Sequence, residues 1–401
     1  MTREEQLQLK RDRKREARRR EREAWEAARG PLDLPFLMLV LILLLIGLIM
    51  LLSASFPSAQ ADGDAFYYIK RQAIFALVGV FAMFWVGKIN YQRFRGVANI
   101  AIIVSIFLLV LVIIPGIGLS SHNATRWLGL PFSKELRFQP SEVAKLGIIV
   151  YFAASIAKKR ERMGNFREGI MPYGIILFVI GVLMLLEPHM SGAILLVGIG
   201  AVMVMVGGIH WKWIAGALGL GTLAGYIVLF TNFMEKIGYN SDRIITWRDA
   251  FWDAQNKSYQ MAQSFITIGS GGLLGVGLGK SRQKFMFLPE EHNDFIFAVV
   301  CEELGLIGAT LIMLLFALLI IRGYWLAIHA RDRFGSLLVV GATTQIALQT
   351  FLNIAVVTGL IPATGISLPF FSYGGTALAI QLAEMGIILS VSRQIPAPKG
   401  G

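Results

Sequence analysis

The sequence predicts an all-α integral membrane protein with ten transmembrane helices, and three observations lead to that fold class. The chain has 401 residues, of which 55% are hydrophobic and only 16% are charged. The apolar residues fall in blocks of about 18 to 25, the length that crosses a hydrocarbon core about 30 Å thick. Lys and Arg gather between alternate blocks, as the positive-inside rule requires of a multi-pass protein.

Ten apolar blocks follow one another along the chain as separate spans. They cover roughly residues 34–56, 70–88, 96–115, 140–157, 169–187, 190–208, 211–231, 295–322, 336–358 and 374–392. With the first span starting on the cytoplasmic side, most of the 38 Lys and Arg residues are cytoplasmic, and so are both termini. One long external loop, 232–293, joins spans seven and eight, and its length makes helical pieces within it the expectation.

A basic segment, residues 1–33, precedes the first span and contains the run RDRKREARRR. It is not a cleavable signal peptide, because the apolar block that follows is too long and lacks a small-residue cleavage site. Two interpretations stay open: a solvated helix that fixes topology, and a surface helix attracted to anionic lipid. Nucleic-acid binding is not expected. Residues 395–401 form a short cytoplasmic tail.

The stretch LPEEHNDFIFAVVCEELG, from Leu288 to Gly305, leads a polar segment directly into an apolar block. It places Asp294 at the outer lip of the eighth span, and Glu302 and Glu303 within it. A charge at such depth costs about 2.5–3.5 kcal/mol on insertion scales, so it indicates a functional site or an internal partner. Glu302 lies about 12 Å further along a helix. We therefore interpret Asp294 as the chemical group and the deeper glutamates as internal structural polarity.

Glu290, Glu291 and His292 come just before Asp294, at the end of the long loop. They include residue types that bind metals, but no HExxH or comparable spacing accompanies them. We interpret the two glutamates as the solvated end of the loop, and we expect no metal site. The single cysteine, Cys301, excludes an intramolecular disulfide and a Cys-based zinc cage.

Glu142 and Lys145 stand three residues apart in the fourth span, so they share one helix face near its external end. Burial of either charge alone would be unfavourable. One interpretation is a structural ion pair, and the other is an arrangement that orients a catalytic carboxylate and presents a cation to a diphosphate. If Asp294 lies near Lys145, the charged form of Asp294 is favoured.

The segment 269–281 reads GSGGLLGVGLGKS and invites comparison with a phosphate-binding P-loop. The spacing fails, because Leu274 stands where that motif needs a glycine. The glycines allow either a close approach of backbone segments or an anion site. In the second case their amides, with the cations that follow, would hold an anionic lipid-linked ligand.

Two other segments combine turn residues with polar groups. The segment 353–376 is dense in Gly and Pro, and irregular backbone at membrane depth requires cover from protein or a watery cavity. It is expected to re-enter the membrane from outside, with a structural floor as the alternative to a functional role. The turn EPHMSG, 187–192, joins spans five and six, where a structural role is at least as well supported as a direct one.

Four stretches together resemble the SEDS family (shape, elongation, division and sporulation), which includes FtsW, RodA and SpoVE. They are NIAVVTGLIPATGISLPFFSYGG at 353–375, GSGGLLGVGLGKSRQKFMFLPEEHNDFIFAVVCEELG at 269–305, QPSEVAK at 139–145 and the pair Arg126-Trp127. The resemblance implies a ten-span core over 34–394 that polymerises lipid II into glycan strands at the outer face of the bacterial cytoplasmic membrane. Undecaprenyl diphosphate would be released, in division or sporulation.

The resemblance also implies partners. These are lipid II, a class B penicillin-binding protein, divisome or elongation proteins, and membrane lipid. No cofactor is required, and a divalent cation at the diphosphate stays an open question. Two alternatives from other functional classes remain: a lipid II flippase without polymerase activity, and a scaffold for the penicillin-binding protein.

Residue by residue, the resemblance implies that Asp294 is the catalytic carboxylate, as a general base or as the group that positions the acceptor hydroxyl. The substrate-binding or supporting residues that we expect are Lys145, Glu142, Arg126, Trp127, Arg282, Lys284, Ser372 and Tyr373. Among them Lys145, Arg126, Arg282 and Lys284 are candidates to stabilise the diphosphate.

The chain departs from the family pattern in two places. Many members carry EPDLGT after the fifth span, whereas this chain has His189 at the position of that Asp, so a role for an Asp there does not transfer. The basic N-terminal segment also lies outside the common core. Both features favour the FtsW and SpoVE side of the family over RodA.

Overall fold

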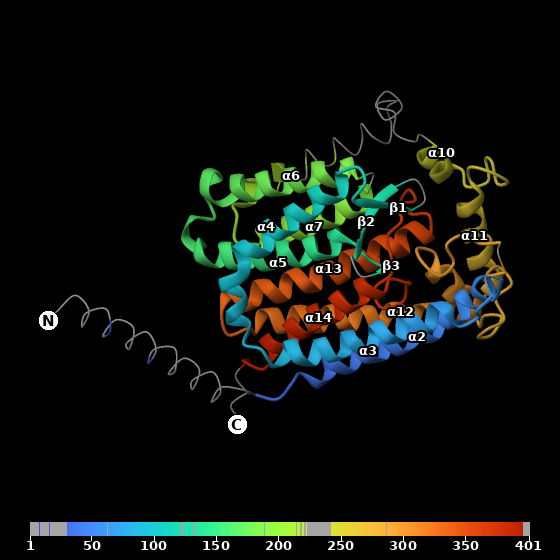
Figure 1. Ribbon diagram of the computed structural model, residues 1–401, viewed down its shortest axis with the longest axis horizontal. Helices are drawn as coiled ribbons and strands as arrows, with labels where there is room; N and C mark the ends of the chain where they lie inside the picture. Colours follow the sequence, from blue (N-terminus) through green and yellow to red (C-terminus); the bar gives the residue numbers. More distant parts are fainter. Residues whose placement is uncertain are drawn as a thin grey trace.

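The computed structural model describes residues 30–395 with gaps at 62, 122–123, 131–132, 188 and 286. Within 214–241 it describes only residues 215, 216, 219 and 222, and before residue 30 only Gln8 and Glu16. Helices that run along the long axis of the molecule form one bundle (Figure 1). The predicted basic segment, 1–33, and the tail, 395–401, thus fall almost entirely outside the described residues.

Eight helices of the described chain are long and apolar enough to cross a membrane. They are α2 (Leu34–Ala61), α3 (Tyr67–Lys88), α4 (Phe94–Ile113) with η1 (Tyr91–Arg93), α5 (Pro140–Lys158), α6 (Met171–Leu186) with η3 (Phe166–Ile170), α12 (Ile296–Ile328), α13 (Arg333–Val357) and α14 (Gly375–Ser392). A shorter apolar helix, α7 (Met190–Val206), matches the sixth predicted span. These nine lie where spans were predicted, and the seventh predicted span, 211–231, falls largely outside the described residues.

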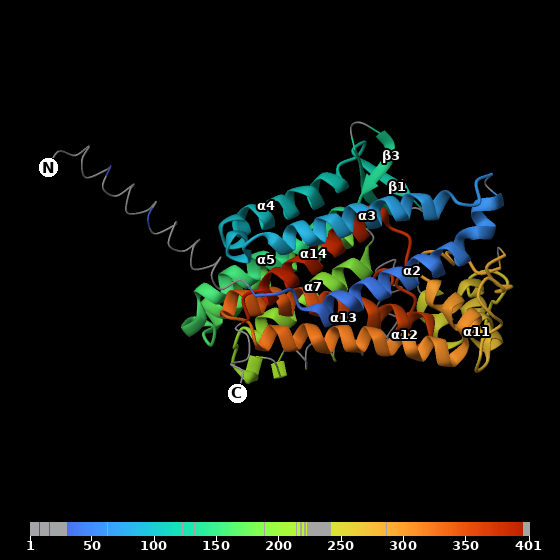
Figure 2. The same ribbon diagram turned by 90° about the horizontal axis from the view of Figure 1, so that it is seen from below.

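The two ends of the described bundle meet, since the amide of Gly30 donates to the carbonyl of Arg393 at 2.8 Å. The long loop contains two helices, α10 (Asp242–Arg248) and α11 (Tyr259–Gly271), with α11 at the opposite end of the bundle in both views (Figures 1 and 2). The expectation of helical pieces in this loop is confirmed. The polar segments around α11 therefore gather far from Gly30 and Arg393.

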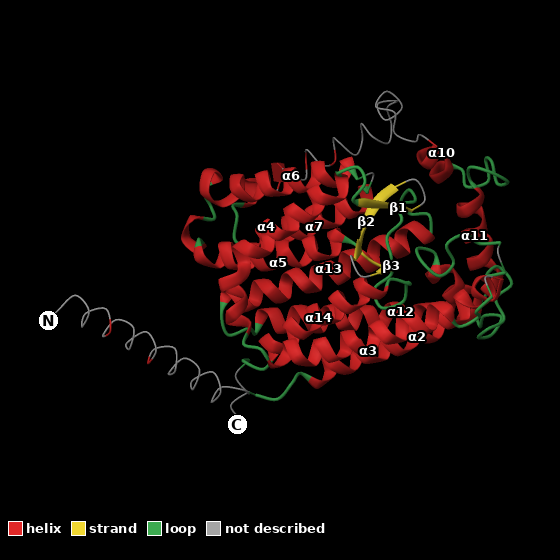
Figure 3. Cartoon of the chain, viewed as in Figure 1, coloured by secondary structure: helices red, strands yellow, loops and turns green. Residues whose placement is uncertain are grey.

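A small antiparallel sheet interrupts the all-helical pattern (Figure 3), and the sequence analysis did not anticipate it. Its strands run in the order β1 (Gly118–Ser121), β2 (Ala124–Leu130) and β3 (Ser133–Phe138). Trp127 pairs with Leu119, and Leu128 pairs with Phe138. The all-α fold class is confirmed for the bundle, and the small sheet was missed because short hairpins pair through backbone hydrogen bonds that leave little periodicity in a brief loop.

Helix α12 is broken at Gly305, whose φ of 68° and ψ of −172° are not helical. The glycine-rich segment fills the break: the amides of Val276 and Gly277 donate to the carbonyls of Glu302 and Glu303 at 2.9 and 3.0 Å. A Cβ added at Gly275 would lie 2.2 Å from the carbonyl oxygen of Glu303. The close-approach interpretation of these glycines is therefore confirmed, and the backbone groups freed by the break are satisfied.

The two deep glutamates of α12 tie the loop to the bundle. The Lys284 ammonium forms an ion pair with Glu303 at 2.9 Å and donates to the Ser53 hydroxyl of α2 at 2.9 Å. Glu302 accepts hydrogen bonds from the Ser281 hydroxyl and from the backbone amide that follows it. This staple, Lys284 with Glu303, joins α2, the glycine-rich loop and α12, as expected of internal structural polarity.

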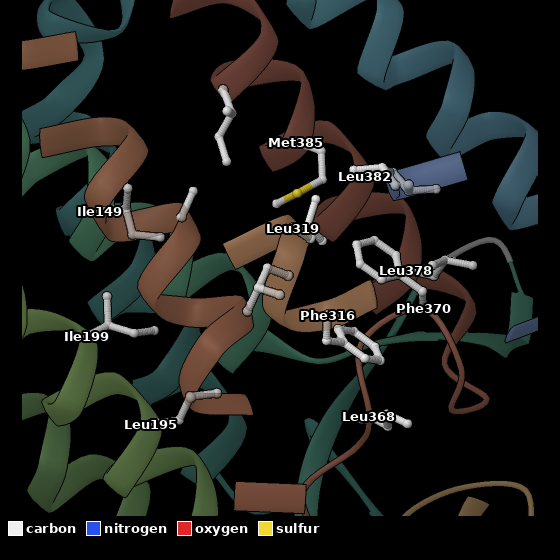
Figure 4. Close-up of a cluster of buried hydrophobic side chains, with 14 of the residues drawn as sticks. Ile149, Leu195, Ile199, Phe316, Leu319, Leu368, Phe370, Leu378, Leu382 and Met385 are labelled. Atoms are coloured by element: carbon white, nitrogen blue, oxygen red, sulfur yellow. The ribbon is translucent and has the colours of Figure 1, made fainter. Parts of the chain in front are cut away.

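An apolar core lies where several helices meet the irregular segment 358–374 (Figure 4). The labelled side chains in that view come from four helices and the segment: Ile149 of α5, Leu195 and Ile199 of α7, Phe316 and Leu319 of α12, Leu368 and Phe370 of the segment, and Leu378, Leu382 and Met385 of α14. All are buried. Burial of so much apolar surface holds the irregular segment at a fixed depth in the bundle.

Candidate functional site

A cavity of about 630 Å³ lies at the end of the bundle that carries α10, the loops and β2. Its wall comes from β2, α5, α7, α10, α11, α13 and α14, together with parts of the stretches 290–295 and 363–374. Four cationic side chains and three carboxylates of the described chain line it: Arg126, Lys145, Arg243, Lys257, Glu142, Glu290 and Asp294. A cavity of this size with convergent charges fits a polar ligand held against an apolar floor.

Seven of the sequence-predicted site residues meet in this cavity. They are Asp294, Lys145, Glu142, Arg126, Trp127, Ser372 and Tyr373. The other two do not line it: Lys284 is committed to the staple, and the Arg282 side chain is exposed on the loop. The structure thus brings together residues from 126 to 373 and leaves both loop cations aside.

The end of α13 and the irregular segment together hold the backbone that carries Asp294. The Asn353 amide donates to the Asp294 carbonyl at 2.8 Å and to the Ile366 carbonyl at 2.6 Å. The Ser372 hydroxyl donates to the carbonyl of Asn293 at 2.7 Å. These bonds explain why an Asn and a Ser stand at such distant positions of the motif: both fix one short stretch of chain.

Gly365 lets the irregular segment approach the Asp294 carboxylate. Its φ is +69°, and a Cβ there would lie 3.0 Å from Asp294 Oδ2. A side chain at this position would be strained by the backbone angle and would also crowd the carboxylate. The glycine therefore keeps the wall of the cavity open beside the acid.

Burial raises the pKa of Asp294 to about 6, and the negative charge of Glu290 acts in the same direction. The positive charges of Arg126 and Arg243 act in the opposite direction. A carboxyl group with such a pKa is largely ionised at neutral pH yet retains a higher proton affinity than an ordinary aspartate. That combination suits a general base.

Glu142 and Lys145 form a buried ion pair of 2.7 Å at the start of α5. The charged form of Asp294 was expected to be favoured if Lys145 lay near it, and the cations that act in this way on Asp294 are Arg126 and Arg243. Lys145 pairs with Glu142 and acts on His189 and on Glu384 of α14. The cavity therefore has two charged regions: an acid beside arginines, and a lysine beside a glutamate.

Two cations of the long loop were missed by the sequence analysis. Arg243 of α10 lines the cavity and donates to the Ala363 carbonyl at 3.2 Å, and Lys257 also lines it. The indole of Trp247 donates to the Gly359 carbonyl at 3.0 Å and so holds α10 against the irregular segment. No motif marks these residues, and the only signal in the sequence was the basic character of the loop.

The turn after α6 is more deeply buried than expected of an external turn. Glu187 is 2% exposed and His189 is 8% exposed, and the His189 ring lines the cavity. Burial raises the pKa of Glu187 to about 8 and lowers the pKa of His189 to about 3. Both side chains are therefore neutral at pH 7, and His189 adds a hydrogen-bonding group to the wall but no charge.

The end of the long loop differs from the sequence interpretation. Glu291 is buried instead of solvated, and Glu290 lines the cavity with a φ of 59°. The His292 ring packs on Tyr68 with centroids 4.4 Å apart and contacts Tyr373 edge-on. The interpretation was wrong because the aromatic residues of α3 and of the irregular segment cover this stretch, which no local pattern reveals.

The donor set of the cavity favours an anionic ligand over a metal ion. Within the part of the chain that the structure describes, no three side chains of His, Cys, Asp or Glu are grouped to hold a metal. Arginine and lysine side chains supply only hydrogen-bond donors and positive charge. The arrangement can therefore bind phosphate oxygens at its cationic side and abstract a proton at Asp294.

The comparison with protein families decides the identity. The family model described as a cell cycle protein and named for FtsW, RodA and SpoVE matches residues 34–396. The chain belongs to this family. It is therefore a SEDS protein and a multi-pass membrane protein, in agreement with its apolar helices.

Two curated relatives are similar to this SEDS protein over most of their length. Stage V sporulation protein E of Bacillus subtilis (strain 168) is 41% identical over 368 residues, which are 90% of this chain and 97% of the relative. A probable peptidoglycan glycosyltransferase FtsW of Geobacter sulfurreducens is 39% identical over 365 residues, or 90% of this chain and 95% of the relative. The resemblance drawn from the motifs is confirmed.

Solved structures share the fold of this SEDS protein. One comes from work described as "Structural coordination of polymerization and crosslinking by a peptidoglycan synthase complex", with a TM-score of 0.75 and 26% identity over 90% of this chain and 98% of that one. Another is the rod shape determining protein RodA of Thermus thermophilus, with a TM-score of 0.67 and 26% identity over 92% and 99% of the two chains.

Proposed function

We propose that this protein is a peptidoglycan glycosyltransferase that polymerises lipid II into glycan strands during division or sporulation. The observation that carries the proposal is the cavity in which Asp294, a carboxyl group with a pKa of about 6, faces a set of cationic side chains. The relatives named as SpoVE and FtsW support the same activity. A base and an anion site in one cavity are what glycosyl transfer from a lipid diphosphate requires.

In this reaction the Asp294 carboxylate takes the proton of the 4-hydroxyl on the acceptor sugar, or at least positions that hydroxyl. The hydroxyl oxygen attacks the anomeric carbon of the donor disaccharide, and the bond from that carbon to the diphosphate oxygen breaks. The bonding electron pair leaves with undecaprenyl diphosphate, and the anomeric centre is inverted. A positioned base contributes about 100- to 10,000-fold to such a step.

The cationic side chains of the cavity stabilise the departing diphosphate. Arg126 and Lys145 keep the role expected from the sequence, and Arg243 and Lys257 join them because they line the same wall. Fixed cations in a site with little water stabilise developing negative charge with no reorganisation during the reaction. A divalent cation bound to the diphosphate itself would be compatible with this arrangement. Trp127 and Tyr373 form part of the same wall.

The topology we propose has ten spans, both termini in the cytoplasm and the cavity at the outer face. An even number of spans is supported by the meeting of Gly30 and Arg393 at one end of the bundle. The cavity lies toward the opposite end, beside α10. The core would extend over 34–394, with 1–33 and 395–401 as cytoplasmic segments.

The partner we propose is a class B penicillin-binding protein, within a divisome or elongation assembly. The similarity to a chain from a peptidoglycan synthase complex supports a partner of this kind. Polymerisation by the SEDS protein and crosslinking by its partner would then act on the same strand. No nucleic acid is expected to bind.

A flippase is the rival function, because it would also need polar groups within the membrane. The deep acids of α12 do not favour it: Glu302 and Glu303 are held by Ser281 and Lys284 and do not line the cavity. A scaffold without activity would have no use for a cavity of this charge pattern. We therefore retain both only as outcomes of the test.

The test is polymer formation by the purified protein with lipid II, in the presence of its penicillin-binding partner. Wild type should form glycan strands, and Asp294→Ala should form none while folding normally. Asp249→Ala is the matched control, because Asp249 is an exposed aspartate of the same loop that does not line the cavity. Polymer from Asp294→Ala would overturn the proposal, and so would lipid II transport without any polymer from wild type.

A further inference from the structure

Glu384 of α14 is the most deeply buried acid near the cavity, with no exposed surface. It lies three residues after Gln381, which lines the cavity, so it occupies the same helix face about 4.5 Å deeper. Its Oε2 accepts a hydrogen bond of 2.6 Å from the Gln345 side chain of α13. An acid within a membrane-spanning helix marks a functional site by default. Glu384 is neither the proposed base, Asp294, nor a member of the Lys284–Glu303 staple.

A polar stripe on α13 leads from the cavity toward Glu384. Gln345, Gln349 and Asn353 follow one another at intervals of four residues, so they share one face of the helix. Each side chain donates through its amide nitrogen: Gln345 to Glu384, Gln349 to Ser367 and Asn353 to the Asp294 carbonyl. The stripe thus connects the backbone of Asp294 with the buried acid.

The oxygens of this stripe are buried acceptors without donors. The amide oxygens of Gln345, Gln349 and Asn353 have no hydrogen-bond partner among the described residues, and neither has Glu384 Oε1. Buried polar atoms in proteins are nearly always satisfied, by protein groups or by ordered water. These acceptors therefore need hydrogen-bond donors other than the side chains of the stripe itself.

Lys145 is a donor close enough to matter. Its ammonium is 3% exposed and carries three N–H groups, and its recorded partner among the described residues is Glu142. The charges of Lys145 and Glu142 both act on Glu384. The ammonium thus contacts one carboxylate and acts electrostatically on a second, deeper carboxylate whose Oε1 needs a donor.

We propose that the cavity continues one helical turn deeper as a polar annex, formed by Gln345, Gln349, Glu384 and Lys145, which holds ordered water. Water in the annex accepts a hydrogen bond from Lys145 and donates one to Glu384 Oε1. Glu384 is then a positioning residue that holds the Lys145 ammonium from below, while Glu142 holds it from the side. The ammonium stays in the wall of the cavity even when an anionic ligand competes with Glu142. The consequence for catalysis rests on the proposed function, whereas the geometry does not.

The first experiment tests the annex without any enzymatic readout. Thermal unfolding of the purified protein is measured for wild type, Lys145→Met, Glu384→Gln and the double variant. The double variant should unfold at the temperature of the less stable single variant, because both substitutions break one linked arrangement. Met385→Leu is the control, since Met385 is the buried neighbour of Glu384 and does not line this cavity, and its effect should add to that of Lys145→Met.

Additive effects of Glu384→Gln and Lys145→Met would overturn the coupling. A map that resolves ordered water gives the second criterion. It should show water within hydrogen-bond distance of both Lys145 Nζ and Glu384 Oε1. A dry annex in which Glu384 Oε1 bonds to a protein donor would overturn the proposal as well.

The second experiment separates positioning from a purely structural role. Glu384→Gln should lower kcat for lipid II polymerisation about tenfold and leave KM nearly unchanged, because a misplaced Lys145 weakens stabilisation of the transition state and not ground-state binding. Equal kcat in wild type and variant would contradict the role in catalysis. A wild type that makes no polymer would refute the proposed function, and the unfolding cycle would still decide on the annex.

Discussion

Two buried ion pairs of nearly equal geometry serve different parts of this molecule. Lys145 and Glu142 are 2.7 Å apart with side chains 3% and 11% exposed, and Lys284 and Glu303 are 2.9 Å apart with side chains 4% and 0% exposed. The first pair lines the cavity, and the second does not. Distance and burial therefore do not tell a functional pair from a structural one.

The surroundings of each lysine do make that distinction. The Lys284 ammonium also donates to the Ser53 hydroxyl and to the Gly279 carbonyl, so its bonding capacity is filled by the fold. Lys145 faces the cavity, where a ligand or water can reach its ammonium. Buried acceptors nearby, such as Gln349 Oε1, have no hydrogen-bond partner among the described residues. An ion pair whose lysine has all its hydrogen-bond partners within the fold stabilises the protein. An ion pair whose lysine faces a cavity is available to bind a ligand.

The largest expected effect concerns Asp294, which extends the comparison to the acid of the cavity. Polymerisation should fall about tenfold per pH unit below about pH 6, as the Asp294 carboxylate gains a proton and can no longer act as a base. The measurement is the initial rate of polymerisation at about each pH unit from roughly pH 5 to 8. A rate that is flat through this range would contradict the role of Asp294.

Stability at Asp294 should change in the opposite direction. Its folded-state pKa of about 6 lies above the unfolded value of about 3.9, so protonation favours the folded protein, and stability is lost as pH rises through about 6. Asp294→Asn should therefore increase the free energy of unfolding at pH 8, on the order of 2 kcal/mol, and so raise the unfolding temperature. An unfolding temperature below that of wild type would contradict this.

The staple gives the largest expected effect on stability alone. Glu303→Leu leaves the Lys284 ammonium buried without its carboxylate, which should cost about 3–5 kcal/mol of stability. The double variant Glu303→Leu with Lys284→Met should recover most of that loss, because no buried charge remains. Denaturation of all three variants in detergent measures the difference. A double variant less stable than Glu303→Leu would show that the pair does more than hold the loop.

Gly275→Ala should give a smaller effect at the same place. A Cβ there meets the Glu303 carbonyl, and the glycine has a φ of +78°. The substitution should cost about 1–3 kcal/mol, because backbone and loop must shift together. Gly269→Ala is the matched control, since a Cβ at that position meets nothing within 4 Å. Equal unfolding temperatures for the two variants would contradict the close approach.

The smallest effect is expected at Arg282. Its side chain is exposed and does not line the cavity, so Arg282→Ala should change polymerisation less than about threefold. Arg126→Ala is the matched arginine in the wall of the cavity and should lower the rate about 100-fold or more, as loss of a transition-state donor does. A loss of polymerisation rate in Arg282→Ala comparable to that in Arg126→Ala would indicate that the glycine-rich loop is part of the active site.

Much of the fold was readable from the sequence, because apolar length and charge asymmetry are local properties. Nine of the predicted spans coincide with apolar helices of the described chain. The sheet at 118–138 was not foreseen, because short pairing strands leave a weak pattern. Candidate residues such as Asp294 and Lys145 were recognised from motifs and do line one cavity.

Other features of the site depend on tertiary contacts that no local pattern carries. Sequence reasoning grouped Lys284 with the diphosphate cations, because nothing in GKSRQK tells whether a lysine faces the cavity or Glu303. Arg243 and Glu384 were missed for the same reason. The long loop around α10 and α11 and the irregular segment 358–374 decide which side chains meet, and their connecting stretches have no periodicity from which a facing direction could be read.

The measurement that tests the comparison most directly pairs Lys145→Met with Lys284→Met and records both polymer formation and unfolding temperature. Lys145→Met should abolish polymer and lower the unfolding temperature less than Lys284→Met does, because water in the cavity can partly solvate Glu142. Lys284→Met should unfold at a much lower temperature, yet its folded fraction should polymerise lipid II at the wild-type rate. A stable Lys284→Met protein without activity, or an active Lys145→Met protein, would contradict the division between the two pairs.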